Sequence, residues 1–104
     1  MRRVRILDEA AEEAAEAAGR YELQRPGLGA EFERAVDAAL DLLEEEIVPL
    51  TTMPGVAGKR GAKRLILRRF PYDVVVRERG DELVVVAFAH QSRRPGYWRA
   101  RLRT

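Results

Sequence analysis

The sequence predicts an α+β fold in which a helical hairpin packs on a small, twisted, mostly antiparallel sheet, in the order β-α-α-β-β-β. Two amphipathic segments fill most of the first half of the chain, and three β-rich segments follow one another closely in the second half. The 104 residues, 46% hydrophobic and 35% charged, are enough for one domain, residues 1–104, with a single modest core.

The first strand and the first helix are predicted near the N-terminus. Residues 2–7 alternate basic and apolar side chains, with Val4 and Ile6 on one side, as in a short strand. Asp8 and Glu9 then begin a helix, because acidic groups in the first turn interact favourably with the helix dipole. The apolar face of this helix is expected to hold Ala11, Ala14, Ala18 and Tyr21, and the opposite face Glu9, Glu12, Glu13 and Glu16.

A second helix is predicted after residues 25–29, where the stretch RPGLG interrupts the first one. Pro49 ends this helix, and the short connection makes the two helices an antiparallel hairpin. The apolar face of the second helix recurs at helical spacing and consists of Phe32, Val36, Ala39, Leu40, Leu43 and Ile47.

Three strands are predicted after a basic loop rich in glycine and proline at residues 49–63. The strands cover residues 63–70, 72–79 and 82–90. Gly80 and Asp81 form the turn between the last two. The last strand is apolar at nearly every position, which predicts a central strand that is covered on both faces.

Alternation along this last strand assigns its side chains to two faces. One face is expected to hold Val84, Val86, Phe88 and His90, and the other Leu83, Val85 and Ala87. The helical hairpin covers one of these faces, and the C-terminal segment or a partner covers the other. Pro95 and Gly96 allow the chain to turn back, and Trp98 would then stabilise the sheet by about 2–3 kcal/mol through burial.

The charge is distributed very unevenly along the chain. Residues 1–54 carry a balance of −7 and residues 55–104 a balance of +9, which together give the net charge of +2. A strongly basic half indicates a polyanion or an acidic protein as its partner. The alternative is that arginine is simply the preferred solubilising residue of this chain.

The composition excludes several kinds of site and location. The chain has no cysteine and one histidine, which excludes disulfides, thiolate zinc sites, iron–sulfur clusters, cysteine nucleophiles and a histidine-rich metal site. We therefore expect no metal and no cofactor. No apolar run approaches the roughly 20 residues needed to span a bilayer, and no signal peptide is evident, so a cytoplasmic protein without membrane contact is expected.

Three stretches together carry a resemblance to a known family. They are "Y…RPGLGAEF" between the helices, "KRLILRRFPYDVVV" in the strands and "VVVAFAHQSRRPGYWRAR" at the end. In this order and spacing, from about Arg3 to Arg101, the chain resembles the RelE/ParE superfamily of bacterial type II toxin–antitoxin toxins, and most closely its ParE-like branch. The resemblance implies a toxin that blocks growth, either by poisoning DNA gyrase or by cutting mRNA on the ribosome, and that a cognate antitoxin neutralises in a heteromeric complex.

The C-terminal stretch also supplies the candidates for chemistry. A ribosome-dependent, metal-independent endoribonuclease needs an acid, a base and positive charge at the scissile phosphate. His90 would be the acid or base, Arg64 and Arg93 would hold phosphate, and Tyr97 would stack on or orient a base. For His90 and Tyr97 the structural alternative is packing, the histidine at the strand end and the tyrosine beside Trp98.

The middle strand argues against RNA cleavage. Members of the family that cut mRNA usually carry an arginine near the position of Tyr72 and Asp73, and an acidic residue is a poor neighbour for a scissile phosphate. Whether the chain is an enzyme therefore stays open. A toxin that acts by binding, with gyrase as its target, is favoured over the endoribonuclease, and a non-toxic basic RNA-binding module is the third hypothesis.

The remaining basic residues are assigned to two binding surfaces. Target contacts are expected from Lys59, Arg60, Lys63 and Arg94, whose charges suit phosphate or another anionic surface. Antitoxin contacts are expected on the outer side of the hairpin and at Arg68, Arg77 and Arg79. A disordered, acidic antitoxin segment would associate quickly with such a surface and wrap around it. Alternatively, the loop at residues 59–64 is merely solvated.

Overall fold

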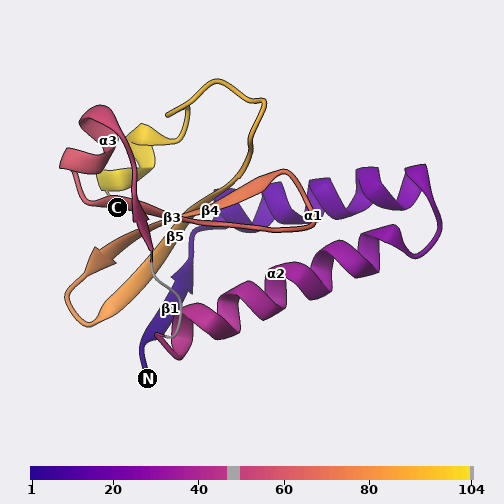
Figure 1. Ribbon diagram of the computed structural model, residues 1–104, viewed down its shortest axis with the longest axis horizontal. Coiled ribbons are helices and arrows are strands. Elements are labelled where there is room, and N and C mark those ends of the chain that lie inside the picture. Colours follow the sequence, from indigo (N-terminus) through magenta and orange to yellow (C-terminus); the bar gives the residue numbers. More distant parts are fainter. Residues whose placement is uncertain (47–49, 104) are drawn as a thin grey trace.

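The computed structural model describes residues 1–46 and 50–103. Its elements are β1 (Arg3–Ile6), α1 (Asp8–Gln24), α2 (Leu28–Glu44), β2 (Thr51–Thr52), α3 (Gly55–Lys59), β3 (Ala62–Ile66), β4 (Tyr72–Arg79), β5 (Glu82–His90) and a 3-10 helix (Arg99–Arg103). In the described part of the chain the strands form one sheet in the order β1-β5-β4-β3-β2 (Figure 1).

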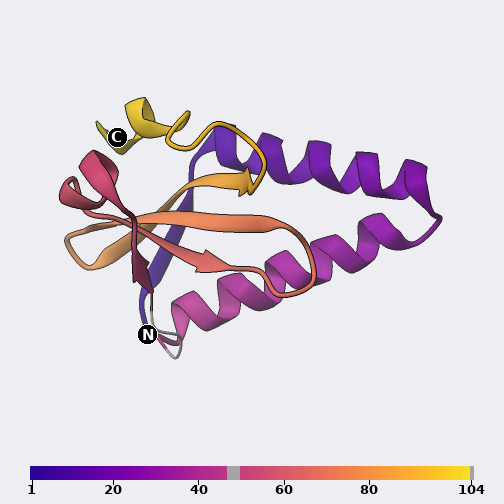
Figure 2. The same cartoon turned by 45° about the horizontal axis from the view of Figure 1, so that its top comes forward.

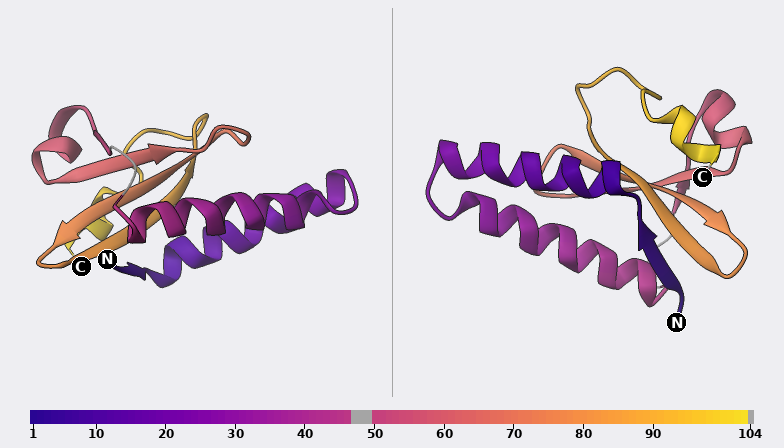
Figure 3. Two further views of the ribbon diagram at one scale, coloured as in Figure 1. Left: turned by 60° about the horizontal axis from the view of Figure 1, so that its bottom comes forward. Right: turned by 180° about the vertical axis from the view of Figure 1, so that it is seen from behind.

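The strand pairing confirms the predicted fold class. β1 lies parallel to β5, with Ile6 opposite Val85, and the other neighbouring strands are antiparallel. The antiparallel helices α1 and α2 lie together on one side of the sheet (Figure 3, left). The last two predicted strands coincide with β4 and β5. They are joined at Gly80, which has a positive φ of 62° that glycine adopts without strain.

A β-bulge corrects the predicted faces of β5. Val75 is opposite Ala87 but Val76 is opposite Val85, so Val86 is an extra residue that has no partner on β4. Side chains of paired residues share a face, and the insertion therefore reverses the alternation on one side of it. Leu83 and Val85 lie on the same face as Phe88, contrary to the strict alternation that the sequence predicted.

The helical hairpin turns where the sequence predicts. The connection is shorter than the predicted break at residues 25–29, because α2 already begins at Leu28. Gly27 has a φ of 90° and precedes α2, whereas Gly29 lies inside α2. The carboxylate of Glu22 accepts hydrogen bonds from the amides of Gly27 and Gly29, and so satisfies free donors at the start of α2. Gly29 allows close packing, because a Cβ atom there would stand 2.6 Å from the carbonyl oxygen of Ala18.

The predicted apolar face of α1 is confirmed for Ala18 and in part for Ala14 and Tyr21, which pack against the core, but not for Ala11. Ala10, Ala17 and Ala18 are buried, whereas Ala11 is exposed. Glu13, predicted on the solvent face, has a side chain that is only 14% exposed. It lies within the buried seam between Ala10 and Ala17, three residues after the first and four before the second, which is one helical face.

The predicted apolar face of α2 is confirmed for Phe32, Val36, Ala39 and Leu43, while Leu40 is half-buried. Ile47 and Pro49 lie outside the described residues. The segment predicted as a loop at residues 49–63 contains β2 and the short helix α3. Two-residue strands and single helical turns leave no periodic pattern in a sequence, and the amide of Met53 closes this segment by donating to the carbonyl of Ala62.

The C-terminal segment covers the face of the sheet opposite the hairpin, as the sequence predicts. Trp98 is 2% exposed and Leu102 is buried in the same core. Arg77 on β4 donates a hydrogen bond to the carbonyl of Leu102. The segment then passes close to the beginning of α1 (Figure 2), where it meets Glu13. No helix in the described ranges is long and apolar enough to cross a membrane.

Candidate functional site

A cavity of about 450 Å³ lies between the sheet and the C-terminal segment. It brings together all four residues predicted for chemistry, namely Arg64, His90, Arg93 and Tyr97, and also Arg94. They come from β3, from the end of β5 and from the segment that follows. Three arginines on one cavity make it suited to an anionic ligand or surface.

Arg64 does not face this cavity as a free cation. Its Nη1 atom lies 3.3 Å from Oδ2 of Asp73 on the neighbouring strand. Gln91 donates a hydrogen bond of 3.1 Å to the other carboxylate oxygen, and Asp73 is buried between them. The Nε atom of Arg64 is buried and has no hydrogen-bond partner among the described residues. Asp73 therefore supplies a counter-charge to one of the two arginines that were predicted to hold phosphate.

The side chain of His90 lies on the hairpin face, opposite Tyr72. The two rings meet edge to face with centroids 5.0 Å apart, and the Tyr72 hydroxyl accepts a hydrogen bond from Arg20. The amide of Ser92 donates to Nδ1 of His90 at 3.0 Å, which requires a free lone pair on that nitrogen. Asp73, Gln91 and Arg64 lie on the other face, so His90 only borders the cavity.

Glu13 is the centre of the polar contacts that hold the C-terminal segment. Its Oε1 accepts hydrogen bonds from the amide of Phe88 at 3.1 Å and from Arg101 at 2.9 Å. Its Oε2 accepts from the hydroxyl of Tyr97 at 2.5 Å and from the second amino group of Arg101 at 3.3 Å. Arg93 forms an ion pair with the same oxygen at 3.6 Å and stacks on the Tyr97 ring.

These contacts shift the protonation of Tyr97 and Arg101. Burial raises the pKa of the Tyr97 hydroxyl above its usual range, and its hydrogen bond to the negative Glu13 raises the pKa further. Burial lowers the pKa of Arg101, but the hydrogen bond and the charge of Glu13 outweigh that effect and raise the pKa overall. Tyr97 is therefore held in its neutral form, which is unfavourable for a general base.

Glu13 was missed as a site residue because it stands among several acidic residues of α1. The alanines of α1 are so frequent that the sequence does not show which of them are buried. Only the structure shows that the buried Ala10 and Ala17 stand three residues before Glu13 and four residues after it, which places this acidic side chain within the buried seam. Arg101 belongs to the basic C-terminal stretch, and its pairing with Glu13 joins positions that are 88 residues apart in the sequence.

The residues predicted for target binding are scattered. Lys59 and Arg60 are exposed at the end of α3, whereas Arg94 borders the cavity. Lys63 lies on the hairpin face, where it is 2.6 Å from Glu78. That hydrogen bond, together with one from Arg2, lowers the pKa of Glu78.

The residues predicted for antitoxin binding do not form one surface. Arg68 is exposed at the turn between β3 and β4, and it lines a groove of about 520 Å³ beside α2. Arg79 lies at the opposite end of β4, and Arg77 contacts the C-terminal segment. An antitoxin that meets all three would have to pass along the whole sheet.

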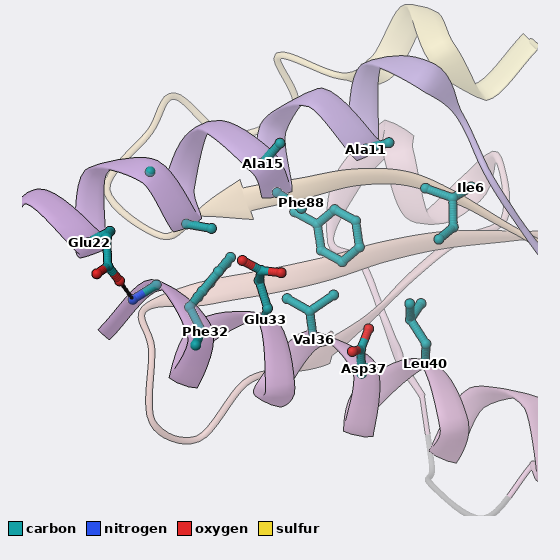
Figure 4. Close-up of a pocket in the computed structure, with 15 residues that line it drawn as sticks. Ile6, Ala11, Ala15, Glu22, Phe32, Glu33, Val36, Asp37, Leu40 and Phe88 are labelled. Atoms are coloured by element: carbon teal, nitrogen blue, oxygen red, sulfur yellow. Dashed lines mark hydrogen bonds between the residues drawn. The ribbon is translucent and has the colours of Figure 1, made fainter. Parts of the chain in front are cut away.

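A second, apolar groove of about 680 Å³ runs between α1 and α2. Alanines of α1 form one wall, Phe32, Val36 and Leu40 form the other, and Phe88 of β5 lies beneath them (Figure 4). Glu33 and Asp37 stand on the rim. Because alanine side chains are small, the groove is open to an apolar side chain of a partner.

The described residues contain no group of three or more histidine, cysteine, aspartate or glutamate side chains that could hold a metal ion. The acidic side chains nearest the cavity, Glu13 and Asp73, are each engaged by arginine. The cavity therefore offers a basic surface that is lined by the aromatic rings of Tyr97 and Trp98, and the carboxylates of Glu13 and Asp73 are paired with arginines.

Comparison with solved structures places this arrangement among known folds. The chain superposes on a structure described as "Chromosomal ParDE TA system from P. aeruginosa" with a TM-score of 0.73 and 15% sequence identity. The match covers 86% of this chain and 96% of the other. The two chains therefore share a fold. The sequence itself matches no family model and no curated protein, so the predicted resemblance is confirmed at the level of the fold.

Proposed function

We propose that this protein is the toxin of a type II toxin–antitoxin module and that it inhibits growth by binding a macromolecular target, with DNA gyrase as the first candidate. The fold that it shares with the ParDE structure supports a toxin–antitoxin role. The C-terminal segment with its exposed Arg94 and Arg99 is the proposed target-binding surface.

One observation carries the preference for binding over catalysis. The groups that a nuclease would use are engaged in structural contacts: Tyr97 donates to Glu13, Arg64 pairs with Asp73, and His90 packs on Tyr72. Each of these contacts fixes a side chain or neutralises its charge, whereas general acid–base chemistry needs a group that reaches the substrate with a suitable pKa. A binding surface needs no such freedom.

The endoribonuclease is kept as the second candidate, because the cavity does bring Arg64, His90, Arg93 and Tyr97 together. Catalytic contacts often tighten only in the complex with substrate. This candidate requires that RNA binding displaces Asp73 from Arg64 and Glu13 from Tyr97.

The apolar groove between α1 and α2 is the proposed antitoxin site. Its alanine wall, the facing side chains of Val36 and Leu40, and the buried ring of Phe88 beneath suit the apolar face of an amphipathic helix (Figure 4). Arg68, in the separate groove beside α2, and Arg79, at the far end of β4, would meet acidic residues of the same partner only if its chain continued beyond this groove. Binding there would leave the C-terminal segment uncovered, unless the antitoxin wraps around the sheet.

Controlled expression of the chain without a partner is the deciding experiment. We expect growth to stop, purified gyrase to lose supercoiling activity, and co-expression of the antitoxin gene expected beside this one to restore growth. New mRNA ends at codon-defined positions that vanish in His90→Ala and Arg93→Ala would favour the endoribonuclease instead. Unimpaired growth would overturn both toxin proposals and leave the non-toxic RNA-binding module.

A further inference from the structure

One edge of the central strand β5 is only partly covered by β1. The last β1 pair joins Ile6 to Val85, and the amide of Leu7 then donates to the carbonyl of Val85 at 3.0 Å. Beyond this point β5 continues to His90 without a strand on that side among the described residues. Unpaired strand edges normally attract other strands or are covered by side chains.

Two side chains take the place of the missing strand. The amide of Phe88 donates to Oε1 of Glu13 at 3.1 Å, and the carbonyl of Val86 accepts a hydrogen bond from Arg101 at 3.0 Å. Glu13 and Arg101 are themselves joined by two hydrogen bonds. The pair offers one acceptor and one donor to the strand edge, as a neighbouring strand would.

The same carboxylate connects the edge to the basic segment. Tyr97 and Arg101, four residues apart, both bond to Glu13, and Arg93 lies within ion-pair distance of it. Burial of Trp98 and Leu102 also holds the segment on the sheet. Apolar contact has no preferred direction, however, whereas charge-assisted hydrogen bonds fix orientation.

We propose that Glu13 is the positioning residue of the C-terminal surface, and that its carboxylate sets where the exposed arginines of residues 93–103 meet the target. The inference rests on the proposed function for the role of that surface, but not for the contacts themselves. Without Glu13, the guanidinium groups of Arg93 and Arg101, 3.8 and 5.4 Å from the centre of the Tyr97 ring, would lose the carboxylate that they share. The Arg101 side chain is only 19% exposed, so the loss of this charged partner is costly there.

The chain contains a suitable probe, because Trp98 is its single tryptophan and is buried under the segment. In Glu13→Gln we expect the rate of acrylamide quenching of Trp98 to rise about twofold or more as the segment opens. Glu12→Gln is the matched control, since it removes the same charge from an exposed position one residue away. Its quenching should equal that of the wild type.

The Phe88 amide separates positioning from general loss of structure. A glutamine at position 13 can still accept from this amide, but an alanine cannot. We expect hydrogen exchange of the Phe88 amide to stay slow in Glu13→Gln and to become fast in Glu13→Ala, while Trp98 becomes accessible in both. Slow quenching of Trp98 in Glu13→Gln would overturn the proposal.

Two arginine variants cover the case in which changes at position 13 prevent folding. Arg101→Met should expose Trp98 as Glu13→Gln does. Arg101→Lys keeps the charge but not the paired geometry, so it should restore part of the protection. If neither variant differs from the wild type, the proposal is wrong.

Inhibition of purified gyrase separates this inference from the proposed function. If wild-type protein inhibits gyrase, Glu13→Gln should weaken inhibition and Glu12→Gln should not. Unchanged inhibition alongside an exposed Trp98 would overturn the role of Glu13 in target contact and leave the toxin proposal intact. If the wild type neither inhibits gyrase nor stops growth, the proposed function fails, and the Trp98 measurement still decides whether Glu13 positions the segment.

Discussion

Arg64 on β3 and Asp73 on β4 form an ion pair of 3.3 Å beneath the cavity that carries the predicted site residues. The carboxylate is almost enclosed, with a side chain that is 11% exposed. We expect Asp73→Ala to destabilise the protein by about 3 kcal/mol, because it leaves the Arg64 guanidinium without its counter-charge. Denaturant unfolding followed by circular dichroism measures this loss.

The double variant Asp73→Ala, Arg64→Met is the control for that prediction. Removing both partners should cost less than removing Asp73 alone, since no unpaired charge remains. The single variant Arg64→Met completes the comparison. If the losses of unfolding free energy in Asp73→Ala and Arg64→Met add up to the loss in the double variant within about 0.5 kcal/mol, the two residues are not coupled.

The hydroxyl of Tyr97 should lose its proton only at a higher pH than an ordinary tyrosine does. An ordinary tyrosine has a pKa of about 10, and burial together with the hydrogen bond to Glu13 raises the pKa of Tyr97. The folded state holds this proton more tightly than the unfolded chain does. The resulting contribution to stability is therefore present in full below the unfolded pKa, and it is lost as the pH rises towards the folded value.

Ultraviolet titration of the phenolate checks this expectation. Subtracting the curve of Tyr97→Phe from that of the wild type isolates the signal of Tyr97 from those of the two other tyrosines. Glu13→Gln should shift the isolated transition to lower pH. A transition of Tyr97 at the ordinary pH in the folded wild type would contradict the hydrogen bond.

Gly29 and Gly19 should respond in opposite ways to substitution by alanine. A Cβ atom at Gly29 would stand 2.6 Å from the Ala18 carbonyl, so Gly29→Ala should push the helices apart and cost about 1–3 kcal/mol. At Gly19, also helical, nothing lies within 4 Å of the added atom. Gly19→Ala should therefore stabilise the protein by about 0.5–1 kcal/mol. The unfolding midpoints of the two variants should lie on either side of that of the wild type.

Arg94 is the sharpest test of target binding at the cavity. It is exposed and borders the cavity, so Arg94→Gln should change the free energy of unfolding by less than about 0.5 kcal/mol. Inhibition of the target should nevertheless weaken, and the difference from the wild type should shrink as salt is added. Arg34→Gln, which removes the same charge from the exposed side of α2, should leave inhibition unchanged. Equal inhibition by both variants would move the target surface away from the cavity.

The fold was predictable because its main signals are local. The apolar period of α2, the glycines of the hairpin and the β-rich runs on either side of Gly80 each lie within about 20 residues, and each points to the element that forms. The short elements β2 and α3 and the bulge at Val86 were not predictable in this way. They satisfy contacts with distant strands and leave no pattern of their own.

The sequence by itself determined the order of the longer helices and strands, the basic C-terminal segment and the residues that gather at the cavity. Only the tertiary structure decided what those residues can do, because their protonation and charge depend on partners from other elements. Asp73 reaches Arg64 from the neighbouring strand, and Glu13 reaches Tyr97 and Arg101 from the far end of the chain. Neutralisation of a charge depends on distance in space, which spacing along a sequence does not encode.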